Sequence, residues 1–246
     1  MPHIEIAAEK LFEIGGLTIT NTLLMGWIAV LILGVAAWIV SKKIGLIPGS
    51  LQNIFELIVD KFLDLMAGVF GSREKAVRYF PLVSTIFLFI LVSNWLGILP
   101  GIGSVGFFKE HDGEEIFIPL FRSSASDLNF TLALAITAVL TVNFMGITAI
   151  GAAKHFSKFF SFKSPVKFFV GILELISEIA KMISFSFRLF GNVFAGEVLL
   201  VITAFLVPVF IPVPFLILEI FVGFIQALVF AMLTMVFISI AVAEQH

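Results

Sequence analysis

The sequence predicts an all-α integral membrane protein, with five transmembrane helices and one amphipathic helix in the membrane interface. Hydrophobic residues make up 60% of the chain and charged residues only 13%, and the mean hydropathy is +1.13. A soluble domain normally carries about 25% charged residues. Five apolar runs are long enough to cross a hydrocarbon core of about 30 Å as helices. We therefore expect residues 1–246 to form a single membrane domain.

The first half of this domain contains two predicted spans with an interfacial helix between them. Residues 1–22 form an acidic outer segment, unlike the basic start of a signal peptide. Span 1 is predicted over residues 23–41 and ends before a pair of lysines. Residues 50–70 carry apolar side chains on one helical face and acidic or amide side chains on the other, which is typical of an interfacial helix. Span 2 is predicted over residues 79–100.

The second half contains three further spans. A polar outer loop over residues 101–126 precedes span 3 at 127–152, and a basic loop at 153–167 follows. Span 4, residues 168–206, is much longer than the roughly 20 residues of an upright helix, so it must tilt or break. A proline-rich turn leads to span 5 at 215–243.

The basic residues orient these spans. Threading the spans back and forth across the membrane places most of the 15 lysines and arginines on one side. They are Lys42, Lys43, Lys61, Arg73, Lys75, Arg78, Lys154, Lys158, Lys163 and Lys167. By the positive-inside rule this side is cytoplasmic, so we expect the N-terminus outside and the C-terminus in the cytoplasm.

Span 4 carries a polar stripe on one helical face. Its members recur at steps of three or four residues: Glu174, Ser177, Lys181, Ser184, Arg188 and Asn192. Arg188 lies inside an apolar run, where a charged side chain costs roughly 2.5–3.5 kcal/mol by insertion scales, so we expect a functional reason for it. Its guanidinium is a permanent cation that can make a passing carboxylic acid release its proton.

A second polar set approaches Arg188 from the other side. Glu197 follows it by roughly 13 Å along an ideal helix, and Glu219 and Gln226 share a face of span 5. Structural interpretations stay open: an ion pair of Arg188 with either glutamate, a stripe packed on a polar helix, or a glutamate protonated and bonded to a neighbouring helix.

Three other polar residues in the spans are more typical of structural roles than of ion ligands. They are Asn94, Asp127 and Asn129, which we interpret first as interhelical hydrogen-bonding groups or a helix cap. A role in an ion path is the alternative for each of them.

Other chemistries lack their motifs. The chain has no cysteine, which excludes disulfides and thiolate metal sites. The four histidines, His3, His111, His155 and His246, all lie in predicted tails or loops, so we expect no haem or zinc site in the bundle. No phosphate-binding loop or hydrolase motif is present, and a net charge of -2 does not indicate nucleic acid binding. We expect no cofactor, no metal and no enzymatic activity of this chain itself.

Four segments are too specific to reflect composition alone. They are SFRLFGNVFAGE (Ser186–Glu197), Ser93–Pro100, Arg122–Asn129 and Gln226–Thr234. Together they closely resemble subunit a, also called subunit 6, of the membrane sector of F-type ATP synthases. This resemblance implies a stator against a ring of c subunits, with two offset half-channels that each reach mid-membrane. It further implies b subunits and lipid as partners, a translocated proton or sodium ion, and the plasma membrane of a bacterium as the location.

The resemblance also implies residue roles. Arg188 matches the essential arginine that separates the half-channels and meets the ring carboxylates. The residues expected to line the cytoplasmic half-channel are Glu174, Ser177, Lys181, Ser184 and Asn192. Those expected to line the outer half-channel are Asn94, Asp127, Glu197, Glu219 and Gln226. The two long last spans would tilt along the rotor ring.

Two positions depart from the family pattern. Glu219 stands where many relatives have a histidine, so we expect Glu197 and Glu219 to titrate as a coupled pair with at least one protonated at rest. Gly97 replaces an acid found in some relatives, which argues against an outer-channel role there.

We therefore expect an ion-translocating stator subunit of a rotary ATP synthase that binds no nucleotide itself. Two other classes compete with it. One is a self-contained secondary transporter in which Arg188 binds an anionic substrate, and which would transport as a purified single chain. The other is a passive scaffold of a membrane complex, which would tolerate the loss of Arg188.

Overall fold

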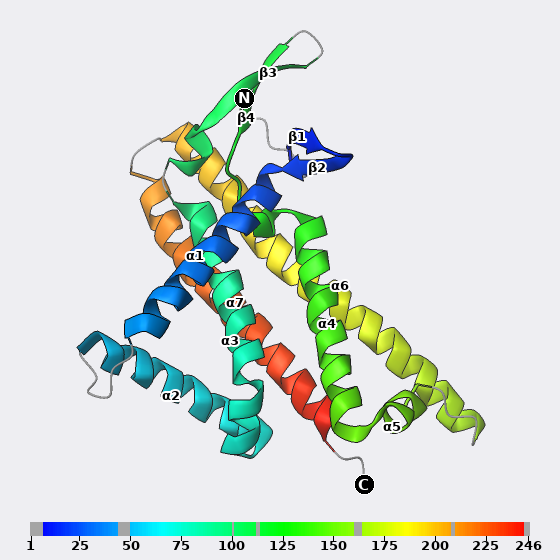
Figure 1. Cartoon of the computed structure of the whole chain (residues 1–246). Coiled ribbons are helices and arrows are strands. Elements are labelled where there is room, and N and C mark those ends of the chain that lie inside the picture. Colours follow the sequence, from blue (N-terminus) through cyan, green and yellow to red (C-terminus); the bar gives the residue numbers. More distant parts are fainter. Residues whose placement is uncertain are drawn as a thin grey trace.

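The computed structural model describes residues 7–43, 50–99, 101–111, 114–159, 164–207 and 210–243. Five helices are long and apolar enough to cross a membrane, which confirms the predicted fold class. They are α1 (Asn21–Lys43), α3 (Arg73–Ile98), α4 (Leu128–Ile150), α6 (Pro165–Leu206) and α7 (Pro212–Val242). Figure 1 shows them as one bundle, in which α1 lies at the periphery.

Several helices extend beyond the apolar runs used to predict the spans. α3 begins at Arg73 rather than at Tyr79, because a helix can continue past the lipid edge when its end carries basic side chains. α6 and α7 begin at Pro165 and Pro212, since proline is well suited to the first turn of a helix. Parts of several predicted segments lie outside the described residues, namely residues 1–6, Pro100, 112–113, 160–163 and 208–209.

The long fourth span is one unbroken helix. α6 has 42 residues, so it is about 63 Å long at 1.5 Å per residue, roughly twice the hydrocarbon thickness. The sequence left two alternatives for this span, a tilted helix or a broken one. In the structure α6 is continuous, so it must tilt to fit the membrane. Figure 1 shows α6 running diagonally from the hairpins to the opposite end of the molecule.

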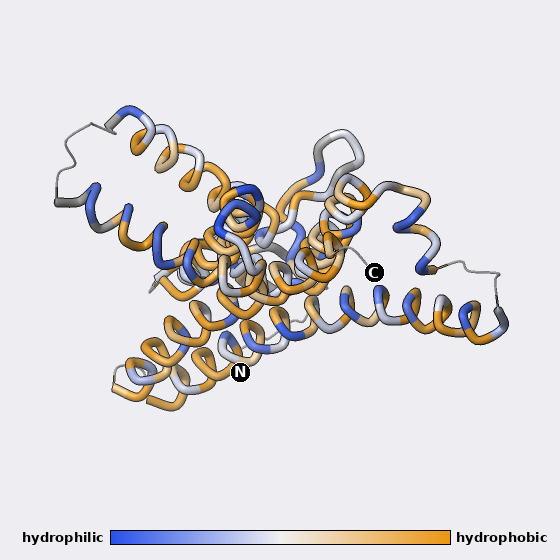
Figure 2. The backbone as a smooth tube through the Cα atoms, turned by 90° about the horizontal axis from the view of Figure 1, so that it is seen from below, coloured by the Kyte–Doolittle hydropathy of each residue, from blue (hydrophilic) through white to orange (hydrophobic). Residues whose placement is uncertain are grey.

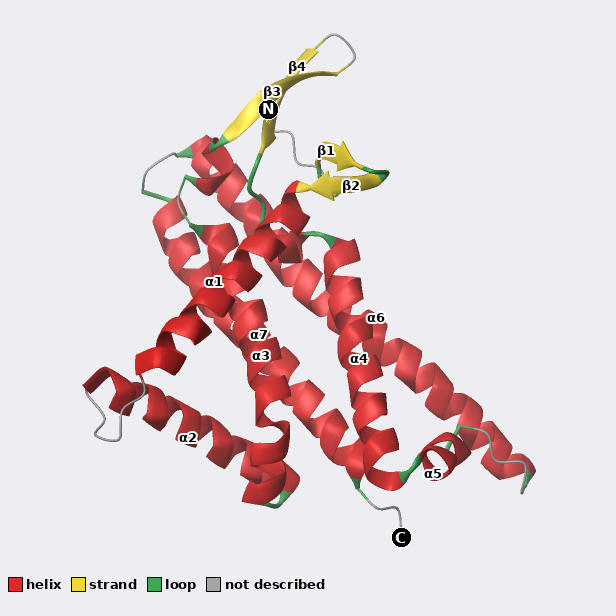
Figure 3. Cartoon of the chain, viewed as in Figure 1, coloured by secondary structure: helices red, strands yellow, loops and turns green. Residues whose placement is uncertain are grey.

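The two ends of the bundle differ. One end, which we call the hairpin end, carries two antiparallel hairpins, β1 (Lys10–Ile14) with β2 (Leu17–Thr20) and β3 (Gly106–His111) with β4 (Glu114–Pro119). Figure 3 shows these strands outside the helices. They were not predicted. Two short 3-10 helices, η1 (Ile102–Ser104) and η2 (Ser124–Ser126), complete the loop that contains the second hairpin.

The opposite end, which we call the basic end, holds the six-residue helix α5 (Ala152–Ser157) and the end of α7. Lys154, Lys158 and Lys167 lie there, together with Lys75 and Arg78 at the start of α3. The two ends therefore carry the charge asymmetry expected from the sequence.

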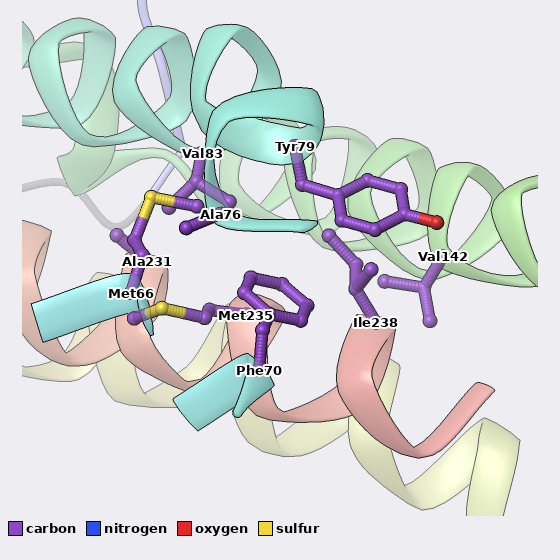
Figure 4. Close-up of a cluster of buried hydrophobic side chains, with 9 residues drawn as sticks. All are labelled: Met66, Phe70, Ala76, Tyr79, Val83, Val142, Ala231, Met235 and Ile238. Atoms are coloured by element: carbon purple, nitrogen blue, oxygen red, sulfur yellow. The ribbon is translucent and has the colours of Figure 1, made fainter. Parts of the chain in front are cut away.

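The core lies where α3 and α7 cross. Figure 4 shows one buried cluster, formed by Met66, Phe70, Ala76, Tyr79, Val83, Val142, Ala231, Met235 and Ile238. Two of these come from α2 (Ser50–Phe70), so α2 is held only through its last turns. Its acidic face is exposed, and Arg73 joins Asp60 and Asp64 at 2.7 Å each.

Most of the outer surface of the bundle is apolar. α1 exposes large side chains along its length, among them Trp27, Leu31 and Trp38, and α4 and α7 do the same at Phe144 and Ile217. Figure 2 shows that hydrophobic residues predominate along the long helices. Such a surface is stable only in lipid or against another apolar protein surface.

Candidate functional site

Arg188 is a half-buried side chain on α6 without an ion pair in the described part of the chain. Its Nη2 donates a long hydrogen bond to Ser184 Oγ at 3.4 Å. Its carbonyl accepts a bond from Asn192 Nδ2 at 2.8 Å. The alternative interpretation of Arg188, an ion pair with Glu197 or Glu219, is therefore not seen among the described residues, and the guanidinium remains available to an external acid.

The two sides of α6 around Arg188 have opposite characters. Phe185, Leu189 and Val193 are buried in a second apolar cluster with α3, α4 and α7. Phe187 is 56% exposed, and the small residues on the same side, Ser177, Ala180, Ser184, Gly191 and Ala195, are also exposed. Arg188 thus borders an outward face of small side chains, which allows another helix to approach closely.

A cavity of about 470 Å³ lies at the hairpin end, between α3, α6, α7 and the loop segments that precede η1 and η2. Its polar lining comes from residues far apart in the sequence: Asn94, Ser104, Arg122, Ser123, Glu197 and Glu219. The structure therefore brings together three of the five residues predicted for the outer path. Asp127 and Gln226 are not part of this lining.

Arg122 is the feature of this cavity that sequence reasoning missed. Its buried guanidinium donates from Nε to Glu197 Oε1 at 2.9 Å and from Nη1 to the Ala7 carbonyl at 3.1 Å. Glu197, which was predicted for the outer half-channel, is therefore paired with Arg122. The available signal was its place at the start of the Arg122–Asn129 segment, one of the four on which the resemblance depends.

Glu219 is buried where α6 and α7 touch. Gly196 faces its carboxylate so closely that a side chain at 196 would overlap it. Farther along the same helix pair, the centroids of the Phe185 and Phe230 rings lie 4.5 Å apart. These two contacts fix an antiparallel register, which places Gln226 at the level of Arg188.

Asn94 and Asp127 have structural partners. Asn94 Nδ2 donates to the Gly223 carbonyl at 3.0 Å, and its Oδ1 is buried without a partner among the described residues. Asp127 is the N-cap of α4, since it accepts from Asn129 N at 2.9 Å and from Thr22 Oγ1 at 3.0 Å. The contacts of Asp127 are therefore those of a helix cap, as one of its two interpretations expected.

A smaller cavity of about 50 Å³ lies at the basic end, with room for a few water molecules. Its polar lining comes from three helices and the turn after α5: Asn143, Lys154, His155, Lys158, Glu174, Glu178 and Lys181. Two of the predicted stripe residues, Glu174 and Lys181, meet here. Ser177, Ser184 and Asn192 lie outside it on the exposed side of α6.

A hydrogen-bonded chain crosses this smaller cavity. Lys181 Nζ lies 2.7 Å from Glu178 Oε1 and 4.7 Å from the centroid of the Phe237 ring. Asn143 Nδ2 donates to Glu178 Oε2 at 3.1 Å, and His155 Nε2 lies 3.0 Å from Asn143 Oδ1. Glu178 was not predicted, although it stands four residues after Glu174 on the edge of the stripe.

His155 corrects an expectation from the sequence. It was assigned to a loop, but it lies in α5 and is 1% exposed, against Gly146 of α4. Because Asn143 Oδ1 can only accept, His155 Nε2 is the donor. Burial lowers the pKa of His155, and Lys158 lowers it further, while Glu178 opposes the shift. A neutral ring with an unprotonated Nδ1 fits this site.

The pKa of Lys158, in the turn after α5, is also lowered mainly by burial. Burial lowers the pKa of Lys158, and the nearby carboxylates Glu178 and Glu174 oppose this effect. Its ammonium lies 4.6 Å from the centroid of the Phe159 ring. The basic-end cavity is therefore a partly dehydrated site in which three lysines surround two glutamates.

Comparison of this sequence with those of known proteins identifies similar proteins. The model of the family "ATP synthase A chain" matches residues 23–239. A protein of Gloeobacter violaceus named ATP synthase subunit a is 33% identical over 99% of this chain and 92% of its own length. Its namesake in Moorella thermoacetica is 30% identical over 97% of each chain, and that in Helicobacter pylori is 36% identical over 82% of this chain and 80% of its own.

Proposed function

Because the chain belongs to the ATP synthase A chain family, we propose that it is the proton-translocating stator subunit of a rotary ATP synthase. It is a multi-pass membrane subunit that serves ATP synthesis without being the catalytic part. One observation carries the residue-level proposal. Arg188 is half-buried, has no ion pair within the described residues, and stands on α6 between cavities at opposite ends of the bundle.

The two cavities support two offset half-channels. In this proposal the hairpin-end cavity, with Glu197 and Glu219, admits ions from one side, and Gln226 continues the path to the level of Arg188. The basic-end cavity, with Glu174 and Lys181, opens toward the other side. Ser177, Ser184 and Asn192 extend that second path along the exposed face of α6.

The outward face beside Arg188 would meet the carboxylates of a c-subunit ring. A guanidinium about 4 Å from a carboxylate favours its ionised form by roughly 4 kcal/mol at an effective dielectric near 20, before desolvation. A ring carboxylate that reaches Arg188 therefore releases its proton into one half-channel. It can re-enter lipid only after it takes up a proton from the other, because a charged group in lipid is costly. Arg188 also blocks a direct leak between the half-channels.

The placement in the membrane follows from the charge distribution and the relatives. The relatives are bacterial, which supports the cell membrane of a bacterium as the location. The basic end would face the cytoplasm, with the N-terminus outside. The b subunits of the peripheral stalk and lipid would cover the apolar outer surfaces, α1 and α2 among them.

Proton pumping by the complete ATP synthase in vesicles tests this proposal. Arg188→Gln should abolish ATP-driven acidification of the vesicles, because the ring carboxylates would no longer release protons. Lys167→Gln also removes a positive charge, but from an exposed side chain at the start of α6, and should pump normally. Normal pumping by Arg188→Gln would support the passive-scaffold class instead.

Two further measurements separate the remaining alternatives. The purified single chain in liposomes should transport nothing, whereas a self-contained transporter would be active. Pumping by the complete complex with and without sodium decides between proton and sodium ions, and we propose protons.

A further inference from the structure

The buried chain at the basic end contains a carboxylate that the proposed half-channels do not use. Glu178 is 8% exposed, and both of its oxygens are bound, one to Lys181 and the other to Asn143. It adjoins the basic-end cavity, and it lies roughly 15 Å along α6 from Arg188. A carboxylate between water and a polar stripe is suited to take up and release protons.

We propose that Glu178 exchanges protons between the basic-end solution and the polar stripe of α6, and that Asn143 and His155 are positioning residues for it. This inference rests on the proposed function, since it names a residue of the basic-end path. A proton leaving a ring carboxyl reaches water along the stripe, and a Glu178 oxygen takes it from that water. The new O–H bond then breaks, and the proton passes to water of the basic-end cavity.

Two contacts hold the Asn143 amide in its orientation: Nδ2 also donates to the Val139 carbonyl at 3.0 Å, and His155 binds the amide oxygen. The amide has one donor end and one acceptor end, and only the donor end can bind an ionised Glu178. His155 Nε2–H binds the Asn143 oxygen at 3.0 Å, so the Asn143 nitrogen must face Glu178. Without His155, only the Nδ2 bond to the Val139 carbonyl opposes rotation of the amide. A rotated amide would turn its oxygen toward the Glu178 carboxylate and weaken the ionised form of Glu178.

Glu178 is surrounded by residues of four helices. The charged and titratable groups around Glu178 come from α6 and from α5 with its following turn: Glu174, Lys181, Lys154, His155 and Lys158. α4 contributes the Asn143 amide, and α7 contributes apolar residues, of which Phe237 packs on the Lys181 ammonium. Glu178 therefore has a net cationic surrounding, which favours its release of a proton toward the solution.

ATP-driven proton uptake by vesicles with the complete complex tests the role of Glu178. Glu178→Gln removes the proton-exchanging group but keeps its shape, and uptake should fall severalfold at an unchanged amount of assembled complex. Glu178→Asp should restore most of the rate. Glu74→Gln removes an exposed carboxylate at the start of α3 and should leave the rate unchanged.

The positioning role is tested by the dependence of uptake on pH. His155→Ala should move the pH of half-maximal uptake upward, whereas His155→Gln, whose amide can still donate to Asn143, should keep the original profile. Asn143→Ala should shift the profile like His155→Ala. A role limited to stability would lower the amount of complex and leave the normalised profile in place.

The outcomes distinguish this inference from the proposed function. If Glu178→Gln pumps at the normal rate while Arg188→Gln is inactive, Glu178 carries no protons and only this inference fails. If both variants pump normally, the proposed function fails as well. If Glu178→Gln does not assemble, Asn143→Ala decides, and a pH profile identical to that of the unaltered complex would overturn the inference.

Discussion

The hairpin-end and basic-end cavities use similar groups in different ways. The first is large, about 470 Å³, and its ion pair joins a loop residue, Arg122, to Glu197 on α6. The second is about 50 Å³, and its ion pair lies within one helix, between Glu178 and Lys181. The hairpin-end site therefore depends on how loops close over the bundle, whereas the basic-end site depends on helix packing and on one buried histidine.

Among substitutions that test this difference between the two cavities, Arg122→Ala should have the largest effect on stability and pumping. It removes the partner of Glu197 Oε1, while Oε2 is already buried without a partner among the described residues, at a cost of up to about 3 kcal/mol. We expect a lower melting temperature of the assembled complex and slower pumping. Arg122→Lys should recover part of both, since it keeps the charge but not the fork of donors.

A smaller effect is expected from Gly196→Ala at the contact of α6 with Glu219. The added methyl group would overlap the Glu219 carboxylate, so this carboxylate must leave its position or the helices must separate, at a cost of up to about 3 kcal/mol. Thermal denaturation of the complex measures this effect. Gly34→Ala on α1 is the matched control, because nothing lies within 4 Å of its new methyl group. Equal stability of both variants would contradict the close α6–α7 packing.

The basic end should respond to acid through His155. Its pKa is lowered in the folded chain, so below its usual value of 6.5 the unfolded chain binds a proton that the folded chain resists. Stability should therefore fall as the pH decreases below about 6.5, by no more than about 1.4 kcal/mol per pH unit. Proteolysis of the α5 segment in membranes at pH 7.5 and 5.5 measures this change. His155→Gln should remove this dependence of stability on pH. If the dependence is unchanged in the variant, other groups cause it.

The smallest effect is expected at Asp127, just outside the hairpin-end cavity. Asp127→Asn keeps an oxygen for the cap of α4 and should change both stability and pumping little, whereas Asp127→Ala should cost about 1 kcal/mol. The pumping rate of Asp127→Asn separates a cap from an ion ligand. A severalfold loss of pumping at normal stability would restore Asp127 to the outer path.

The sequence predicted best what depends on local periodicity. The five apolar helices and the shared face of Lys181, Ser184 and Arg188 follow from composition and helical spacing. The partner of Glu197 did not follow, because Arg122 lies 75 residues away and reaches it through the fold of a loop. Local patterns carry no information about such contacts.

Two other misses have identifiable causes. His155 lies in a short helix whose polar residues resemble a loop, and its ring is packed against Gly146 of α4 and the Phe159 ring of the following turn. The two hairpins stand outside the bundle, where the hydropathy pattern that defines the spans does not apply. Both features depend on tertiary packing at the ends of the helices.

Disulfide cross-linking to the rotor tests most directly whether the face beside Arg188 meets the ring. The chain has no cysteine, so single substitutions are unambiguous. Phe187→Cys on α6 and Phe144→Cys on α4 replace the same residue type at 56% and 60% exposure. With a cysteine introduced beside the ring carboxylate, Phe187→Cys should cross-link to the ring and Phe144→Cys should not. Cross-linking through Phe144→Cys alone would contradict the account.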